Sequence, residues 1–420
     1  MTDTAMGSAP TEFAVPVGGR LDPAAVAGVP MITRAALNLL THLSHGSLRL
    51  SLPNGRRLRF GGAHPGPDAE MHLKDYGFAW RILTRGHLGA AEGFLRGEWE
   101  TPDLTRFLQF FVANRSELDA RLRGNPVMRR LERAAHLWRR NSKAGSKRNI
   151  HEHYDLGNAF YDKWLDRTMT YSSARFGDEP SKSLEEAQTA KYRSLAERIG
   201  LEPGHRVLEI GCGWGGFAEF AARDVGCHVT GITISEEQLA FARQRLQGAG
   251  LADKTEIRFQ DYRDVEDQFD RIVSIEMFEA VGEEYWPAYF AQVHDRLAPG
   301  GQAGLQVITI SDETWPVYRN GADFIQRYIF PGGMLPAPSV LREQVERAGL
   351  SWSGALTFGL DYAETLKRWH ERFLAAWPDI KPLGFDERFR RMWEYYLSYC
   401  EAGFRAGNID VAQITLTRPA

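Results

Sequence analysis

Residues 206–238 read RVLEIGCGWGGFAEFAARDVGCHVTGITISEEQ. The stretch begins with an apolar run at Val207–Ile210, continues through closely spaced glycines, and ends in a second apolar run at His228–Ile234. Short apolar runs bounded by glycine are typical of buried parallel strands. Glycines at a strand-to-helix turn let the backbone approach a ligand and direct N–H groups at it. The stretch therefore predicts a ligand-binding β-loop-α-β unit, with close backbone contacts at Gly211 and Gly213.

The order of residues in this unit indicates which class of ligand the loop binds. A dinucleotide-binding loop is normally followed by an acidic residue at the end of the second strand, where it holds a ribose. Here the second strand ends at Thr233-Ile-Ser235 without a carboxylate, and Gln238 follows about one helical turn later. The run Glu209-Ile-Gly-Cys-Gly resembles instead the first motif of class I S-adenosylmethionine (SAM) methyltransferases. That resemblance implies SAM as the cofactor.

The chain downstream alternates between strands and helices. Apolar runs at 255–259, 269–275 and 304–310 predict three further strands with helices between them, which is the doubly wound pattern. Polar residues follow two of these strands, at the edge where open α/β sheets bind ligands. The predicted fold class is α/β: a class I SAM-methyltransferase doubly wound sheet, with a helical lipid-covering segment after about Thr309 and a small N-terminal α+β domain.

Composition sets further limits. The chain has 420 residues, a net charge of −3 and 43% hydrophobic residues, as expected for a globular protein with more than one domain. The three cysteines lack metal-ligand spacing and an even count, which indicates a reducing compartment; Cys212 is interpreted as a small residue that fits the glycine loop. No apolar run is long enough to span a bilayer, and the first thirty residues lack a signal-peptide pattern. We expect a cytoplasmic protein, peripheral at the inner face of the cell membrane.

Changes in composition and glycine- and proline-rich stretches predict four regions along the chain. We expect a flexible tail at 1–30, a small α+β domain at 31–120, a basic linker helix at 121–150 and the methyltransferase domain at 151–420. The small domain begins with a helical pattern over residues 32–43, and a hairpin over residues 47–60 turns at Pro53-Asn-Gly55. Its apolar interior suits either lipid binding or a dimerisation and packing role.

The segment from Arg121 to Arg148 is rich in Arg and Lys and contains one acid, Glu132. We expect it to dock on an anionic membrane surface, where each cation contributes about 1 kcal/mol. A solvated linker helix is the alternative. Nucleic acid is disfavoured because stacking aromatics are sparse here and the chain as a whole is slightly acidic. A homodimer, which would let two such segments engage one membrane, is compatible with the sequence.

Three metal-capable side chains follow this segment: His151, Glu152 and His153. A helical zinc site of the HExxH type needs two histidines one turn apart with the glutamate beside them. That spacing is absent, so we expect no metal ion.

From about His151 to the C-terminus, the chain resembles the cyclopropane fatty acid synthases, including the mycolic acid cyclopropane synthases. The resemblance covers nearly two-thirds of the chain and rests on many motifs in register: His153-Tyr-Asp-Leu-Gly157, Tyr171-Ser172, Glu209–Gly216, Gly231–Ser235 with Gln238, Gln260–Asp264, Met277-Phe-Glu279, Tyr328–Gly332, and Tyr362–Leu366 with Trp369. It implies SAM-dependent methyl transfer, through a carbocation, to the cis double bond of an acyl chain in a phospholipid. Loss of a proton from the new methyl group closes a cyclopropane; loss from a neighbouring carbon gives a methyl-branched or methylene product.

In this family a bound bicarbonate commonly acts as the base. The resemblance assigns three members of its shell to Glu279, Ile308 and Tyr328. Two other members of the family pattern, a Cys and a His, are replaced here by Ser173 and Gln306. The base shell of this chain therefore departs from the family pattern.

Glu276 stands where the family tends to carry a small residue. Losing a His and adding a carboxylate makes the pocket more negative, which disfavours a bound anion and makes bicarbonate doubtful. A carboxylate close to the cationic centre can stabilise it or remove its proton. We expect Glu276 to replace bicarbonate wholly or in part. The alternative is that Glu276 points elsewhere, capping a helix or contacting SAM.

The pattern and the resemblance together predict the residues around both ligands. Thr233 and Gln238 are expected at the ribose, Tyr262 and Arg263 near the adenine. The full predicted SAM set is Tyr171, Ser172, Gly211, Gly213, Thr233, Ile234, Gln238, Tyr262 and Arg263. The residues predicted to contact the acyl chain are Tyr154, Phe278, Phe330 and Trp369.

The predicted function is therefore SAM-dependent C-methylation of unsaturated phospholipid acyl chains, with ring closure or with methyl branching as the outcome. Two other classes are weaker. A small-molecule methyltransferase is disfavoured by the Tyr328-Ile-Phe-Pro block, and a non-catalytic lipid-binding protein is disfavoured by the intact stretch from Glu209 to Gln238.

Overall fold

The computed structural model describes residues 12–122 and 156–420. These residues form two compact units. The first unit consists of the described residues up to 122 together with Asp386–Ala406, and the second of those from 156 to Phe385 together with Gly407–Ala420. Within the described ranges, no helix combines the length and apolar character needed to cross a bilayer.

The first unit is built on a five-stranded sheet of order β1-β3-β2-β4-β5. The predicted hairpin is confirmed, because Leu48 pairs with Phe60 and Leu50 with Leu58 in antiparallel register. The strands are β1 (Glu12–Val15), β2 (His45–Ser51), β3 (Arg57–Gly61), β4 (His64–Leu73) and β5 (Trp99–Glu100). The helices are α1 (Met31–Leu40), α2 (Phe78–Leu95), α3 (Leu104–Ala113), α4 (Arg115–Leu122) and α16 (Glu387–Arg405).

Two boundaries differ from the sequence-based expectation. Strand β1 lies inside the region expected to be a flexible tail, because it pairs in parallel with β3. Helix α16 was expected in the methyltransferase domain, but it belongs to the first unit: Thr105 Oγ1 donates to Glu401 Oε2 at 2.9 Å, and Arg391 Nη2 to Glu100 Oε1 at 3.1 Å. An amphipathic pattern marks a buried helix face but not the partner that buries it.

The second unit contains a seven-stranded sheet of order β11-β12-β10-β9-β6-β7-β8. Strands β6 to β10 pair in parallel, and β12 is antiparallel to both of its neighbours. The predicted doubly wound sheet is therefore confirmed. Its strands are β6 (Arg206–Ile210), β7 (His228–Thr233), β8 (Thr255–Phe259), β9 (Phe269–Ile275), β10 (Leu297–Ile310), β11 (Ser351–Thr357) and β12 (Ile409–Thr417).

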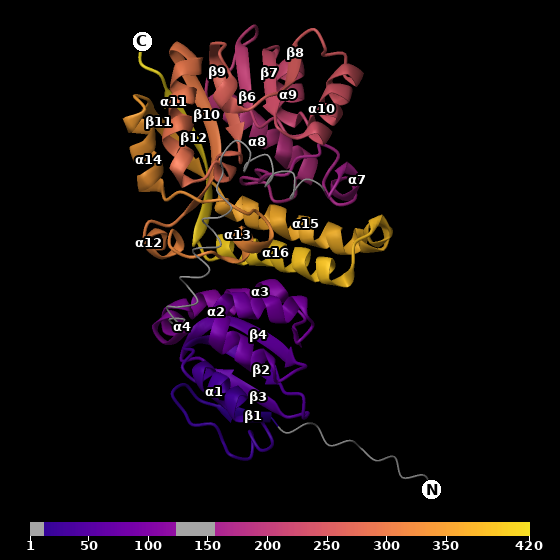
Figure 1. Ribbon diagram of the computed structural model, residues 1–420, viewed down its shortest axis with the longest axis vertical. Helices are drawn as coiled ribbons and strands as arrows, with labels where there is room; N and C mark the ends of the chain where they lie inside the picture. The colour runs from indigo at the N-terminus through magenta and orange to yellow at the C-terminus, as the bar shows by residue number, and fades with distance from the viewer. Residues whose placement is uncertain (1–11, 123–155) are drawn as a thin grey trace. The chain divides into compact units, whose positions relative to one another are not determined.

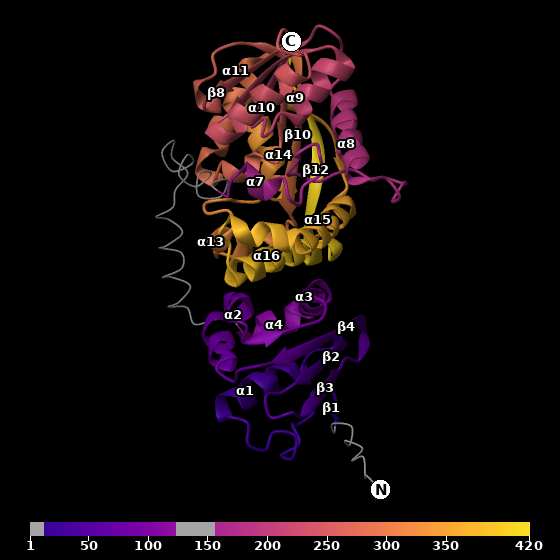
Figure 2. The same ribbon diagram turned by 90° about the vertical axis from the view of Figure 1, so that its right-hand side faces the viewer.

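Helices cover both faces of this sheet (Figures 1 and 2). On one face, α8 (Leu184–Arg198), α9 (Gly216–Phe220) and α10 (Glu236–Gly248) bury a cluster that includes Leu195, Phe217 and Leu246. On the other face, α11 (Trp286–Arg296) and α14 (Pro338–Arg347) bury a second cluster. The two cores hold the loops at the strand ends in place.

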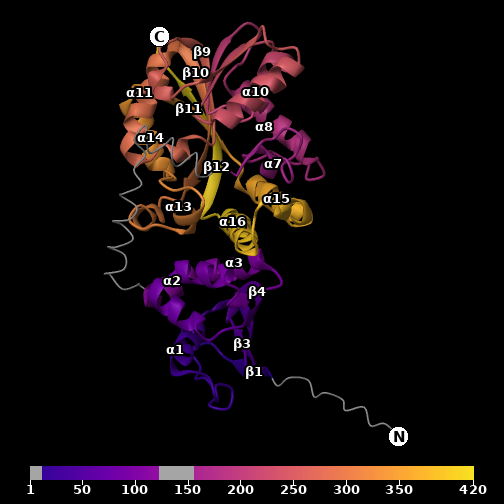
Figure 3. The same cartoon turned by 45° about the vertical axis from the view of Figure 1, so that its right-hand side comes forward.

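Short helices and one long helix gather at the carboxyl end of the parallel strands (Figures 1 and 3). They are α7 (Asn158–Tyr161), α12 (Trp315–Tyr318), α13 (Phe324–Tyr328) and α15 (Gly359–Ile380). Helices α12, α13 and α14 follow β10, which confirms a helical segment after Thr309; its lipid-covering role stays a prediction. The predicted linker is described only up to Leu122, so the basic segment to Arg148 lies outside the described residues, as do His151, Glu152 and His153.

Candidate active site

The glycine loop after β6 has a backbone that glycine adopts readily and other residues do not. Gly211, Gly213 and Gly215 have φ values of +81°, +52° and +79°. A Cβ added to Gly211 would lie 2.7 Å from Cγ of Met277. The strand order reverses at β6, so this loop lies at the point where open α/β sheets bind ligands. The geometry fits the predicted close approach of a ligand to Gly211 and Gly213.

Glu209, in the strand that leads into this loop, is buried, and its Oε2 has no hydrogen-bond partner among the described residues. Burial raises the pKa of this carboxyl to about 8, against the opposing effects of Lys191 and the Ala218 N–H. A buried carboxylate with an unpartnered oxygen fits a cationic ligand, because a nearby positive charge favours the ionised form. SAM carries an ammonium and a sulfonium group, so the residues present fit this cofactor.

The end of β7 presents a polar pair. Thr233 Oγ1 donates to Gln238 Oε1 at 3.0 Å, and the Ser235 hydroxyl caps α10 by accepting from the Gln238 N–H. With its amide oxygen occupied, Gln238 offers N–H groups, which suit a hydroxyl-bearing ligand such as a ribose. Ile234 lies between Thr233 and the cap, directly after β7. The predicted ribose contacts are thus placed beside the glycine loop by neighbouring strands.

Arg263 lies in the short helix η2 (Tyr262–Asp264). Its guanidinium donates to both carboxylate oxygens of Asp261, at 2.8 and 2.7 Å. It also lies 5.4 Å from the ring centroid of Tyr262 and 5.6 Å from that of Tyr285. Tyr262 and Arg263 follow β8, and Tyr285 reaches them from the short helix η4 (Glu283–Tyr285) after β9. The adenine contact of Tyr262 and Arg263 stays a prediction.

Tyr171 lies in an aromatic cluster. Its ring centroid is 5.4 Å from that of Tyr161, 5.7 Å from Trp164 and 5.3 Å from Trp369. Trp369 is fully buried, and its indole Nε1 has no hydrogen-bond partner within the described parts of the chain. Ser172, the next residue, accepts a hydrogen bond at Oγ. The cluster brings the predicted SAM residue Tyr171 against the predicted acyl-chain residue Trp369.

The carboxylate of Glu276 is held by three donors. Its Oε1 accepts from the Ser173 N–H at 2.8 Å and from Gln306 Nε2 at 2.7 Å, and its Oε2 accepts from the Tyr362 hydroxyl at 2.6 Å. Its backbone has a φ of +50°, an uncommon conformation for a non-glycine residue. Burial raises the pKa of Glu276, while the Tyr362 and Gln306 hydrogen bonds and Lys191 oppose that rise. A half-buried carboxylate with an uncommon backbone conformation and three hydrogen-bond donors is a functional-site candidate.

Glu279 lies in η3 (Phe278–Ala280), three residues further on. Its Oε1 accepts from the Ile308 N–H at 2.5 Å, and its buried Oε2 has no hydrogen-bond partner in the described ranges. Burial, followed by the charge of Glu276, raises the pKa of Glu279 to about 8. Two neighbouring carboxyl groups with raised pKa values can hold one proton between them and stabilise a positive charge.

Lys191, on α8, is a fully buried lysine that donates from Nζ to Ser172 Oγ at 2.7 Å. Burial lowers its pKa to about 7, against the opposing charges of Glu276, Asp166 and Glu209. Its ammonium therefore provides positive charge to a group of buried carboxylates and holds the Tyr171-Ser172 segment.

The structure thus brings Ser173, Glu276, Glu279, Gln306 and the Ile308 N–H into one site, and their catalytic roles stay predictions. The other predicted residues are more scattered. Tyr328 lies at the end of α13, with its ring 5.3 Å from Phe324, and Phe330 follows in the next turn. Tyr154 lies outside the described residues.

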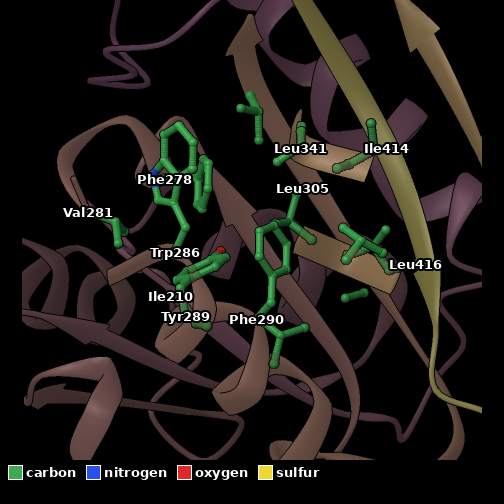
Figure 4. Packing of buried hydrophobic residues seen from close by; sticks show 14 of the residues in the cluster. Ile210, Phe278, Val281, Trp286, Tyr289, Phe290, Leu305, Leu341, Ile414 and Leu416 are labelled. Carbon is green, nitrogen blue, oxygen red and sulfur yellow. The ribbon is translucent and has the colours of Figure 1, made fainter. Parts of the chain in front are cut away.

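Phe278, like Trp369, is buried among aromatic side chains, and its predicted contact with the acyl chain stays a prediction. Only 1% of its surface is exposed, and its ring stacks on Trp286 at 5.4 Å and meets Tyr289 and Phe290 (Figure 4). Its motif neighbour Glu279 points to the site instead, because side chains on adjacent residues of a short helical turn diverge. Phe278 supports the position of Glu279 from the core side.

Three further residues complete this site, and the sequence alone predicts no role for them. Tyr362 lies in the family motif Tyr362–Leu366, but its hydrogen bond to Glu276 depends on the position of α15 relative to the end of β9. Lys191 and Gln413 carried no signal: a lysine in a charged helix and a glutamine in a C-terminal strand are usually exposed, yet both are fully buried.

Comparison with known proteins identifies the family of the chain. The family model described as mycolic acid cyclopropane synthetase matches residues 141–414. The chain is 40% identical to the tuberculostearic acid methyltransferase UfaA1 of Mycobacterium tuberculosis over 409 residues, covering 94% of this chain and 93% of the relative. It is also 40% identical to the cyclopropane-fatty-acyl-phospholipid synthase of Escherichia coli, over 83% of this chain and 88% of that one.

A solved structure gives the same result. The mycolic acid cyclopropane synthase CmaA1, solved with S-adenosylhomocysteine (SAH) and CTAB, superposes with a TM-score of 0.61 and 31% identity, over 64% of this chain and 98% of that chain. The fold, the glycine loop and these matches agree that the cofactor is SAM. The chain belongs to the mycolic acid cyclopropane synthetase family and is a SAM-dependent methyltransferase.

Proposed function

We propose that this enzyme methylates the cis double bond of an unsaturated acyl chain in a phospholipid, and that Glu276 removes the proton that completes the reaction. The observation that carries the proposal is the Glu276 carboxylate, held by Ser173, Gln306 and Tyr362 at the carboxyl end of β9. When bound, SAM supplies an electrophilic methyl group, whose transfer to an alkene carbon leaves a carbocation on the chain.

The two carboxylates suit that carbocation. Glu276 and Glu279 are both half-buried, and a negative charge on Glu276 in a water-poor site stabilises a nearby cation more strongly than it would in water. The Ile308 N–H and the three donors around Glu276 fix both groups before reaction, so little reorganisation is needed. A carboxylate at hydrogen-bond distance from an acidic C–H can then act as the general base.

The same geometry supports Glu276 in place of bicarbonate. The Ser173 N–H and the Gln306 side chain, at two positions where the family resemblance implies bicarbonate ligands, both donate to Glu276 Oε1. A second anion at this place would meet a negative side chain that already uses those donors. We therefore propose that the base is the Glu276 side chain and not a bound bicarbonate ion.

For the product, we propose an open, methyl-branched or methylene-branched chain. With Glu276 as the base in place of bicarbonate, the proton can be removed from a different carbon than in a cyclopropane synthase. The relative matched over 94% of this chain is also named a tuberculostearic acid methyltransferase. The second candidate is the cyclopropane, because the Escherichia coli synthase is equally identical at 40%.

Lipids from cells that express the protein with methyl-deuterated methionine test the proposal. A labelled chain that keeps one double bond, which mild hydrogenation removes, supports the branched product, with three deuterons for a methyl branch and two for a methylene branch. A labelled chain that resists hydrogenation as a ring with two deuterons contradicts it. Absence of labelled lipid would contradict acyl methylation itself.

The proposed acceptor places the reaction at a membrane, and we propose that the basic segment Arg121–Arg148 binds anionic headgroups at the inner face. Co-sedimentation with vesicles that contain or lack anionic lipid tests this. Binding that depends on anionic lipid and weakens with salt supports the proposal, and equal binding to neutral vesicles contradicts it.

A further inference from the structure

Behind Glu276 lies a chain of buried amides that the proposed reaction does not use. Gln306 on β10 donates from Nε2 to Glu276 Oε1 at 2.7 Å, and its Oε1 accepts from Gln413 Nε2 on β12 at 3.1 Å. Gln413 Nε2 also donates to the Lys191 carbonyl at 3.0 Å, and Gln413 Oε1 accepts from the Ser194 hydroxyl at 2.8 Å. Both glutamines are fully buried.

The direction of this chain is set at its far end. A backbone carbonyl can only accept a hydrogen bond, so the Lys191 carbonyl requires the N–H side of the Gln413 amide. The same N–H side then faces Gln306 and requires its oxygen there. Gln306 consequently presents N–H groups, and not its oxygen, to Glu276.

That direction matters for the carboxylate. With Gln306, Ser173 and Tyr362 all donating, Glu276 is surrounded by donors that favour its ionised, proton-accepting form. A reversed Gln306 amide would place an oxygen against Glu276 and favour the protonated form, which cannot act as a base. The Ser173 carbonyl also accepts from Gln306 Nε2, but at 3.4 Å this contact is long.

We propose that Gln413 is a positioning residue that fixes the Gln306 amide as a donor and thereby keeps Glu276 competent as a base. This inference rests on the proposed function of Glu276. Gln413 acts through Gln306 and touches neither substrate nor cofactor in this role, so its loss should lower kcat and leave KM unchanged.

The test compares Gln413→Met with Thr415→Val in the full-length protein. Thr415 is a matched control because it lies on the same strand, is buried, and contacts α8 through the Arg198 carbonyl at 3.5 Å. For Gln413→Met we expect kcat to fall about tenfold or more, as for a misplaced catalytic group, with KM unchanged. The acid limb of the kcat–pH profile should move to higher pH. Thr415→Val should change neither.

Three other titratable groups face Glu276: Lys191 from α8, Tyr362 from α15 and Glu279 from η3. Within the described structure, none of these three side chains bonds to Gln413, but the Lys191 backbone carbonyl accepts from Gln413 Nε2. A shifted pH limb in Gln413→Met must therefore be traced to Gln306 and not to Lys191. A double-variant cycle checks this. Adding Gln413→Met to Gln306→Ala should cost no further activity, whereas additive losses would overturn the inference.

An infrared measurement tests the inference without turnover. Gln413→Met should show an additional carbonyl stretch of a protonated carboxyl, beside those that Glu209 and Glu279 give in wild type, and Glu276→Gln added to it should remove that additional band. Identical spectra for wild type and Gln413→Met would overturn the inference, even if lipid methylation is confirmed. If wild type methylates no lipid but the band appears as expected, the proposed function fails and the positioning role stands.

Discussion

Tyr362 donates its hydroxyl hydrogen to Glu276 Oε2 across 2.6 Å, although 86 residues separate the two in the chain. The bond joins α15 to the end of β9, at the edge of the sheet where the glycine loop also lies. A long helix that follows the core strands thus completes the hydrogen bonding of the proposed base.

Tyr362→Phe removes that donor and leaves a buried carboxylate with one fewer partner. We expect a loss of about 1–3 kcal/mol in the free energy of unfolding and a further rise in the pKa of Glu276, so that the acid limb of kcat moves to higher pH. Tyr192→Phe is the control, because it removes a buried hydroxyl contact of 2.7 Å to Thr170. A pH profile that Tyr362→Phe leaves unchanged would argue against a tuned base.

Glu276→Gln keeps the shape of the side chain and removes its basicity. We expect turnover to fall about 100-fold or more, while SAM binding measured by calorimetry stays close to wild type. Glu256→Gln, on the exposed part of β8, should leave turnover unchanged. Retained turnover in Glu276→Gln would rule out this residue as the base.

The pH dependence of stability should report Glu279. Its pKa is raised from 4.5 to about 8, mainly by burial, so the folded state binds this proton more tightly than the unfolded chain. The resulting stabilisation is fully present below pH 4.5 and is lost as the pH rises to about 8. Glu279→Gln, neutral at every pH, should therefore lose less stability across this window than wild type.

Urea unfolding at about pH 5 and about pH 8, without SAM, measures this difference. Glu256→Gln again serves as the control, because Arg258 lowers the pKa of Glu256 and its linkage has the opposite sign. Parallel losses in Glu279→Gln and wild type would show that Glu279 titrates normally.

The glycine loop gives a prediction about the cofactor. Gly211→Ala adds a Cβ 2.7 Å from Met277 Cγ at a φ of +81°. We expect a cost of about 1–2 kcal/mol in stability and clearly weaker binding of SAH by calorimetry. Gly248→Ala, where nothing lies within 4 Å of the new Cβ, should bind SAH like wild type. Equal affinity in both variants would place the cofactor away from this loop.

The sheet was predictable because local pattern and tertiary position agree there. The apolar run before Gly211 and the absence of a carboxylate after β7 placed the cofactor loop, and the polar ends of β8 and β9 followed from the rule for open α/β sheets. Glu276 was found because it stands where the family carries a small residue. Its three donors come from segments distant in sequence, so only the fold could show them.

The burial of Lys191 and the orientation of Phe278 could not be predicted from the sequence, for one common physical reason. Lys191 lies in a helix rich in charged residues, where periodicity predicts exposure, yet the packing of α8 on the sheet buries it completely. Phe278 shares a motif with Glu279, and only the packing of α11 shows that it points to the core. Burial on one face or the other is a tertiary property that a short motif does not encode.

Bicarbonate dependence tests the central claim most directly. Purified protein is assayed with SAM and vesicles of an unsaturated phospholipid, in buffer depleted of carbon dioxide and in the same buffer with added bicarbonate. With Glu276 as the base, the two rates should be equal. A rate that collapses on depletion and returns with bicarbonate would contradict the account, because the base would then be the bound anion and not the carboxylate that Ser173, Gln306 and Tyr362 hold.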